Sequence, residues 1–187
     1  MAERFNTFQK LEKVLDVGIG TGHPMSKIIH KFPKECEILG IDIDRTYLES
    51  CTELFKPFKN VTIKEMNYYN LVKSQEKFDL IIFSSSFMIL PDREKALSIA
   101  KSHLSENGKI FFLMTLFKER GPAQKLIGII KPYLKYIMTI EMGEIIYEDD
   151  FLNVIKSANL KVTSKEVLNE TIFHKIFKMN VVEVVRQ

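Results

Sequence analysis

Short apolar segments alternate with amphipathic segments over the first 115 residues of the chain. The stretch 78–84 is almost continuously apolar, which is typical of a central strand in a parallel sheet covered on both faces. Other stretches carry apolar residues at helical spacing, as in 23–32, a helix expected to end at Pro33. About five strand–helix repeats of this kind predict an α/β fold in which helices cover both faces of a parallel sheet.

The same pattern defines the bounds of each expected element. Strands are predicted at 11–17, 37–43, 61–66, 78–84, 109–115, 160–168 and 173–186. Helices are predicted at 23–32, 45–56, 92–104, 121–140 and 147–158, with a loop and short helix in 67–75. A turn at Asn107–Gly108 leads into the fifth strand. Only about four residues around Asn169 and Glu170 separate the last two strands, and so short a connection permits only an antiparallel hairpin.

The first predicted strand runs into a loop with three alternating glycines, VLDVGIGTG at residues 14–22. A strand, a glycine loop and a helix form the opening half of a nucleotide-binding βαβ unit. Glycine suits such a loop because a missing Cβ permits positive φ and a close approach of ligand to backbone. Asp16 stands just before the loop, and Asp42 ends the next strand about twenty residues later, where an acid can bind a ribose diol.

Four stretches resemble the class I S-adenosylmethionine-dependent methyltransferases, in the expected order. They are VLDVGIGTG (14–22), ILGIDID (38–44), FDLIIFSSSFMIL (78–90) and LSENGKIFFL (104–113). The resemblance covers roughly residues 11–186 and implies a three-layer Rossmann-like sandwich. Its seven-stranded, mostly parallel sheet would have the order 3-2-1-4-5-7-6, with strand 7 antiparallel.

The loop also differs from that of a dinucleotide-binding domain. The dinucleotide fingerprint has glycine at its sixth position, for close helix packing. Here the sixth position is His23, and the fifth is Gly22. The carboxylate of Asp16 would repel a pyrophosphate but suits the sulfonium and ammonium of S-adenosylmethionine. The pattern therefore favours S-adenosylmethionine over a dinucleotide.

The resemblance implies a set of cofactor-binding residues: Asp16, Val17, Gly18, Gly20, Gly22, Asp42, Ile43, Asn67, Tyr68 and Ser84. Asp16 would hold the methionine ammonium, and the glycines would let the backbone pass beneath the amino-acid part and the ribose. Asp42 would accept hydrogen bonds from both ribose hydroxyls, and Ile43 would pack on the adenine face.

Other expected cofactor contacts have plain structural alternatives. The Asn67 amide oxygen and the Tyr68 backbone N–H would bind the adenine edge, although Asn67 also suits a turn. Asp42 and Asp44 are also suited to cap the next helix, and for Asp44 this interpretation is favoured. Ser84 would lie where cofactor and acceptor meet. The two serines after it are expected to make strand-end hydrogen bonds.

Methyl transfer is an in-line displacement, so the enzyme chiefly aligns the acceptor and excludes water. A base is required only if the acceptor must lose a proton, and the sequence assigns none. Weak candidates are His23, which also suits a helix start, and Tyr147 and His174, which lie in the part expected to shape the acceptor site. No metal site is expected.

The acceptor pocket is expected from 84–90, 114–147 and the chain start. Its predicted lining is apolar: Phe87, Met88, Phe117, Leu126, Ile130, Tyr133 and Tyr136. This predicts a small or medium, partly apolar acceptor, unless the 121–140 helix only covers the sheet edge or forms a dimer contact. The short lead of residues 1–10 instead favours an open site and a protein side chain as acceptor. A third alternative, an inactive binding module, conflicts with the intact Asp16, glycines and Asp42.

Composition narrows the class further. The 187 residues suit a single methyltransferase domain over 1–187, with 45% hydrophobic and 27% charged residues. The net charge of +3 comes from scattered lysines, which argues against a nucleic-acid partner. Two cysteines without a pairing framework indicate reduced thiols. Without a signal-peptide core or an apolar run of membrane-spanning length, a cytoplasmic protein is expected. The oligomeric state is not indicated.

Overall fold

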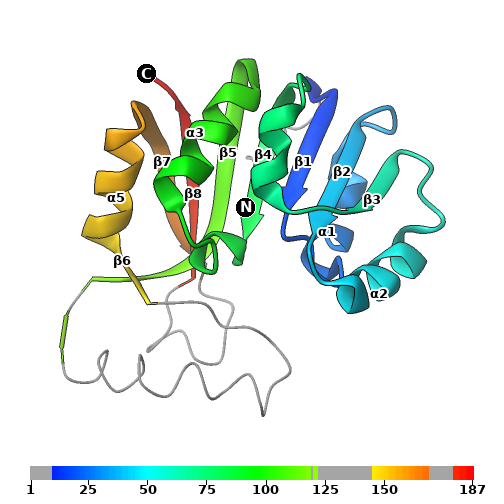
Figure 1. Ribbon diagram of the computed structural model, residues 1–187, viewed down its shortest axis with the longest axis horizontal. Coiled ribbons are helices and arrows are strands. Elements are labelled where there is room, and N and C mark those ends of the chain that lie inside the picture. The colour runs from blue at the N-terminus through cyan, green and yellow to red at the C-terminus, as the bar shows by residue number, and fades with distance from the viewer. Residues whose placement is uncertain (1–9, 119, 122–144, 169–178) are drawn as a thin grey trace.

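The computed structural model describes residues 10–118, 120–121, 145–168 and 179–187, and a mixed β-sheet forms its centre (Figure 1). The strands are β1 (Lys13–Val17), β2 (Glu37–Asp42), β3 (Val61–Glu65), β4 (Phe78–Ser84), β5 (Leu104–Phe117), β6 (Ile146–Tyr147), β7 (Leu160–Leu168) and β8 (Met179–Arg186). Their order is β3-β2-β1-β4-β5-β8-β7, with β6 paired to the end of β5. β8 runs antiparallel to β5 and β7, while the other pairs are parallel. The predicted strand order and its antiparallel strand are confirmed, and β6 is an unpredicted addition.

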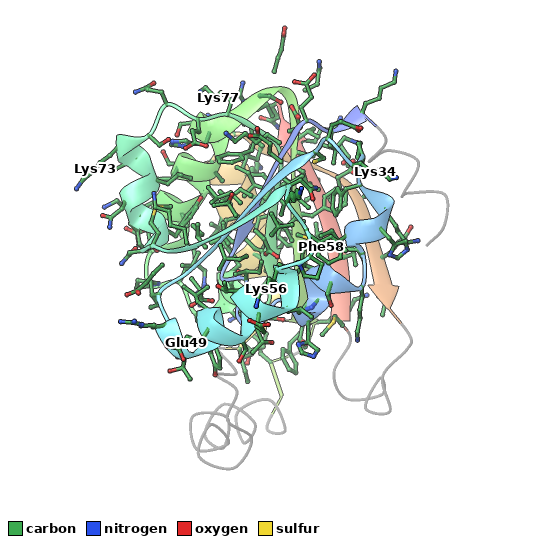
Figure 2. The ribbon with its side chains drawn as sticks, turned by 90° about the vertical axis from the view of Figure 1, so that its right-hand side faces the viewer. Lys34, Glu49, Lys56, Phe58, Lys73 and Lys77 are labelled. Carbon is green, nitrogen blue, oxygen red and sulfur yellow. The ribbon has the colours of Figure 1, made fainter. Side chains whose placement is uncertain are left out.

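Helices cover both faces of this sheet. They are α1 (His23–Ser26), α2 (Arg45–Phe55), α3 (Arg93–His103) and α5 (Glu148–Ser157), with 3-10 turns η2 (Ile29–Lys31), η3 (Tyr68–Lys73) and η4 (Ser86–Met88). One buried core joins the sheet to α3, α5 and η3, which lie in front of it in Figure 1. A second core joins the other face to α1, η2 and α2. In Figure 2 the exposed Glu49 lies on the outer surface of α2, and the exposed Lys56 follows directly after its last residue. The predicted three-layer sandwich is confirmed.

Two of the helices begin at aspartate caps. The Asp44 carboxylate accepts hydrogen bonds from the backbone N–H groups of Thr46 and Tyr47, at 2.8 and 3.4 Å. The Asp92 carboxylate accepts from the N–H of Lys95 at 2.9 Å. Each cap satisfies donors that the first helical turn leaves without an intrahelical partner. The capping role expected of Asp44 is therefore confirmed.

The single helix predicted over 23–32 is wrong. The chain forms α1, leaves the helix at Lys27 and resumes as η2. Within α1 the Ser26 hydroxyl donates to the carbonyl of His23 at 2.9 Å, a local bond that competes with helical geometry. Burial of Met25 and Ile29 still follows the apolar pattern, because the short helix and the 3-10 turn carry both into one core.

The fifth strand is longer than predicted. Leu104 pairs with Phe78 and Lys109 with Leu80, so residues 105–108 bulge out of the ladder. The expected turn at Asn107–Gly108 lies within this bulge. At the other end, β5 continues to Phe117 and pairs with β6.

Three predictions fall partly or wholly outside the described residues. They are the helix at 121–140, the start of the strand at 173–186 and the length of the connection between the last two strands. The antiparallel pairing of β7 with β8 is itself described, from Leu160–Arg186 to Leu168–Met179.

Candidate active site

The centre of the sheet's carboxyl edge lies between β1 and β4. From β1 the chain continues to β2 on one side, and from β4 it continues to β5 on the other side. Such a reversal opens a crevice at the carboxyl ends of the strands, where α/β proteins bind ligands. The glycine loop, residues 18–22, leaves β1 at this point, and the serine turn, residues 84–86, leaves β4. The structure therefore brings these two predicted site segments together.

All three loop glycines have positive φ, at 68° for Gly18, 57° for Gly20 and 79° for Gly22. A Cβ on Gly22 would lie 2.5 Å from the Phe55 ring and 2.9 Å from the Cys51 sulfur, so the loop packs tightly on α2. A Cβ on Gly20 would meet nothing within 4 Å. The middle glycine therefore faces open space, while its backbone conformation is still one that side chains disfavour.

Asp42 holds the glycine loop in place. Its Oδ2 accepts a hydrogen bond from the N–H of Gly20 at 2.9 Å, and its Oδ1 accepts from the N–H of Asp44 at 3.0 Å. Each carboxylate oxygen can accept more than one hydrogen bond, so both retain capacity for a ligand. Sequence reasoning missed this anchoring role, because no local pattern indicates which loop N–H a distant carboxylate will reach.

Asp16 lies beneath the loop with only 2% of its surface exposed. Its Oδ1 has no hydrogen-bond partner within the described part of the chain. Burial, and secondly the negative charge of Asp42, raise the pKa of the Asp16 carboxyl to about 7. A buried carboxylate oxygen without a partner is costly unless a ligand supplies one. The arrangement fits a cation such as the ammonium that the family resemblance implies.

The residues after β2 and β3 supply an exposed apolar side chain and a turn. Ile43 is 69% exposed, which is unusual for so large an apolar side chain. The Asn67 side chain accepts from the N–H of Tyr69 at 3.0 Å and so begins η3. The Tyr68 ring is buried and its hydroxyl donates to the Ala96 carbonyl at 2.8 Å. Only the backbone of Tyr68 is therefore open to a ligand role, and Asn67 shows the turn geometry expected as its alternative.

The serine turn connects β4 to both neighbouring strands. Ser84 pairs with Leu113 of β5, and the N–H of Ser85 donates to the Leu113 carbonyl at 2.7 Å. The hydroxyl of the buried Ser86 donates to the carbonyl of Val17 at the end of β1. The strand-end hydrogen bond expected of Ser86 is confirmed, but its contact with the glycine loop was not predicted.

The structure describes two of the three catalytic candidates, His23 and Tyr147, and neither is placed in a catalytic arrangement. His23 is exposed at the start of α1, and its Nδ1 lies 3.3 Å from the Thr21 hydroxyl oxygen. The guanidinium carbon of Arg120 lies 4.2 Å from the ring centre of Tyr147, which ends β6. The prediction that the helix begins at Tyr147 is wrong by one residue, since Tyr147 lies in β6 and α5 begins at Glu148. His174 lies outside the described residues.

The predicted acceptor lining is only partly described. Phe87 is 1% exposed, and its ring centre lies 4.9 Å from that of Phe112 and 6.0 Å from that of Phe151. The prediction that Phe87 lines the pocket is therefore wrong, because the turn after β4 directs it into the core. Met88 and Phe117 are also buried. The other expected members lie outside the described residues: Leu126, Ile130, Tyr133 and Tyr136.

A cavity of about 490 Å³ lies at the opposite end of the strands. Its lining combines Lys10, Glu12, Asp79, Glu106 and Lys109 with apolar and neutral side chains. Because these charges have both signs and the cavity is remote from the glycine loop, it is not the expected acceptor pocket. Among the described residues, no group of three or more His, Cys, Asp or Glu side chains is placed to hold a metal ion. The same residues include no helix long and apolar enough to cross a membrane.

Sequence comparison finds related proteins. A family model described as a methyltransferase domain matches residues 8–159. Malonyl-[acyl-carrier protein] O-methyltransferase 1 of Ilyobacter polytropus is 29% identical over 155 residues, which are 78% of this chain and 56% of that protein. The chain spans about half the length of the curated relatives it matches.

Structural comparison finds the same fold in solved proteins. The YcgJ protein from Bacillus subtilis aligns with a TM-score of 0.76 and 12% identity, over 100% of this chain and 97% of that chain. Geranyl diphosphate C-methyltransferase from Streptomyces coelicolor was solved with Mg2+, geranyl diphosphate and S-adenosyl-L-homocysteine. It aligns with a TM-score of 0.76 and 12% identity, over 100% of this chain and 76% of that chain. At these identities the likeness shows a shared fold.

Proposed function

This chain belongs to the class I S-adenosylmethionine-dependent methyltransferase family, and we propose that it transfers a methyl group to a small or medium-sized, partly apolar acceptor. The observation that carries the proposal is the buried Asp16 oxygen without a partner, beside a glycine loop with open space at Gly20. A cationic ligand that lies against backbone satisfies both features at once.

The residues around the loop would each bind a different part of S-adenosylmethionine. Asp16 would accept hydrogen bonds from the ammonium, and Gly20 leaves room for the ligand above the backbone. Asp42, already fixed by two backbone N–H groups, would accept from the two ribose hydroxyls. Ile43 would cover one face of the adenine. When bound, the cofactor supplies a methyl group activated by a positively charged sulfur.

The names of two similar proteins bear on the nature of the acceptor. A relative is named for malonyl-[acyl-carrier protein], and a structural neighbour is named for geranyl diphosphate. Both names include a short carbon chain, malonyl or geranyl. We therefore propose a small-molecule or carrier-bound acyl acceptor, and not a nucleic acid.

We also propose that the chain acts as one domain, because a continuous sheet extends from β1 to β8 and both cores pack against it. Cys36 and Cys51 are buried free thiols, which supports our proposal of a reducing compartment such as the cytoplasm.

Titration calorimetry with S-adenosylhomocysteine tests the donor half of the proposal. The unmodified protein should bind it, and Asp42→Ala should weaken binding by about 1–3 kcal/mol, the cost of losing charged hydrogen bonds. Asp44→Ala is the matched control, because that neighbouring carboxylate caps α2. It should lower stability by about 1 kcal/mol and leave the affinity unchanged. No binding at millimolar ligand would contradict the proposal.

Methyl transfer to a cell extract tests the acceptor half. With S-adenosylmethionine labelled in its methyl group, label should appear in small molecules or in an ester that mild base releases from protein. Label that stays on protein after base treatment would instead support a protein side chain as acceptor.

A further inference from the structure

We infer that Ser86 is a positioning residue for the cofactor loop: it ties the turn after β4 to the first glycine of that loop. The inference rests on the proposed function, since it concerns the affinity for the cofactor. The carrying observation is a pair of contacts between segments that lie 69 positions apart in the chain. The Ser86 hydroxyl donates to the carbonyl of Val17, and the Ser86 Cβ lies against Gly18.

The hydroxyl contact acts where β1 stops. Val17 is the last residue of β1, and Gly18 turns the chain out of the sheet with a φ of 68°. On the other side of the loop, the N–H groups of Gly18 and Ile19 both donate to the carbonyl of Ile41, at 2.8 and 3.0 Å. Ser86 therefore holds the loop from the β4 side, while Ile41 holds it from the β2 side.

Ser86 packs so closely on Gly18 that a side chain at position 18 would overlap with it. A Cβ placed on Gly18 would lie 2.4 Å from the Ser86 Cβ and 3.3 Å from its hydroxyl oxygen. The Ser86 Cβ is attached directly to the backbone and cannot swing away. Gly18 thus lacks a side chain for two reasons: its positive φ, and the presence of Ser86 against it.

The backbone conformation of the serine turn places Ser86 against Gly18. Ser85 has a φ of 63°, a left-handed conformation that a residue with a side chain adopts at a cost. Its N–H is held by the Leu113 carbonyl of β5 at 2.7 Å, and the next residue turns back to β1. Local strain of this kind persists where the surrounding contacts determine it, and it concentrates at functional sites.

These contacts link the two sides of the proposed reaction. The turn that carries Ser86 continues into η4 and the segment expected to approach the acceptor, whereas Gly18 belongs to the donor loop. Ser86 does not need to touch the cofactor to affect its binding. It sets where the loop backbone lies, through Val17 and Gly18.

The first test compares two serines whose hydroxyls donate to backbone carbonyls, the buried Ser86 and the exposed Ser102, which lies remote from the glycine loop in α3. Ser86→Ala removes the hydroxyl bond to Val17, and Ser102→Ala removes a hydroxyl bond from Ser102 to the Ile99 carbonyl, 2.8 Å long, within α3. Ser86→Ala should lose a small amount of thermal stability because it leaves the Val17 carbonyl without this donor, whereas Ser102 is exposed within α3 and Ser102→Ala should change stability little. Only Ser86→Ala should raise the Kd for S-adenosylhomocysteine, by about three- to tenfold, measured by calorimetry.

A second test uses the steric contact. Gly18→Ala should weaken binding strongly, and Ser86→Gly should weaken it moderately. The double variant should lose less affinity than the product of the two single losses, because Ser86→Gly removes the atom that the new methyl group overlaps. Circular dichroism spectra at the titration temperature confirm that each variant is folded.

The outcomes separate this inference from the function on which it rests. An unchanged Kd in Ser86→Ala would overturn the positioning role, as would independent effects of the two substitutions in the double variant. Equal losses of affinity in Ser86→Ala and Ser102→Ala would also overturn it, because the effect would then not be specific to Ser86. Failure of the unmodified protein to bind S-adenosylhomocysteine would instead overturn the proposed function, and this inference with it.

Discussion

The two halves of the sheet's carboxyl edge differ in what they leave open to a ligand. At the ends of β1 and β2, the chain has a buried carboxylate oxygen without a partner at Asp16, open space at Gly20 and an exposed Ile43. After β4 and at the end of β5, it directs large side chains into the core, including Phe87 and Phe117. The β1 and β2 side therefore has polar groups with unused hydrogen-bonding capacity for the donor. The β4 and β5 side packs its large side chains into the core and stabilises the fold.

The aromatic core under the β4 side gives the largest expected effect on stability. Phe112 is fully buried, and its ring centre lies 5.3 Å from that of Phe83 and 5.1 Å from that of Phe151. Phe112→Ala should lower the free energy of unfolding in urea by about 3–5 kcal/mol. The half-exposed Phe58, beside α2, is the control, and Phe58→Ala should cost under about 1 kcal/mol. Similar losses in both variants would contradict the stabilising role assigned to the buried aromatic core.

Asp16 should make the stability of the folded protein depend on pH. Because its folded pKa of about 7 exceeds the usual 3.8, the folded state holds the proton more tightly than the unfolded state. Its contribution to stability is therefore fully present below about pH 4 and is lost as the pH rises to 7. The measurement is the free energy of unfolding in urea, without ligand, at pH 4 and at pH 8. Relative to its effect at pH 4, Asp16→Asn should raise this free energy at pH 8 by on the order of 4 kcal/mol.

Asp79 provides a control of opposite sign for these urea titrations. Partial burial raises its pKa, but hydrogen bonds from Ser105 and from the N–H groups of Glu12 and Lys13 outweigh burial, and the net pKa is lowered. Asp79→Asn should therefore destabilise the protein at neutral pH, with an effect that fades as the pH falls through the folded pKa. A stabilising effect of Asp79→Asn at pH 8 would show that the comparison with Asp16 is mistaken.

Substitutions at two loop glycines should distinguish the packing of the loop on α2 from the space that the ligand occupies. Gly20→Ala and Gly22→Ala both place a side chain at positive φ, which costs roughly 1–2 kcal/mol. Gly22→Ala adds overlap with Phe55 and Cys51, and should cost about 1–3 kcal/mol more in urea unfolding. Gly20→Ala should nevertheless lose more affinity for S-adenosylhomocysteine, because its methyl group would occupy the open space above the loop. The reverse ranking of affinities would place the ligand elsewhere.

The same contrast explains which features the sequence alone could predict. The strand β4 matches its prediction because a continuous apolar run has few other stable placements. Asp16 and the glycines could also be found, since their requirements are local: positive φ at each glycine and an acid before the loop. The broken helix after the loop could not, because α1 and η2 bury the same apolar residues as one helix would.

Features that depend on distant contacts were missed for a physical reason. The bond from Gly20 to Asp42 and that from Ser86 to Val17 join segments whose proximity only the assembled sheet provides. The inward placement of Phe87 depends on the left-handed Ser85, and no local pattern indicates such a conformation for a serine. The acceptor side was therefore less predictable than the donor side.

The most direct test of the site compares two ligands. S-adenosylhomocysteine has the amino-acid ammonium, whereas 5′-methylthioadenosine shares the adenine and ribose but lacks it. By calorimetry, the unmodified protein should prefer S-adenosylhomocysteine, and Asp16→Asn should abolish that preference while it leaves methylthioadenosine binding unchanged. Asp42→Ala should weaken both ligands by a similar factor. Equal weakening of both ligands by Asp16→Asn, or no weakening of either, would contradict the assignment of Asp16 to the ammonium.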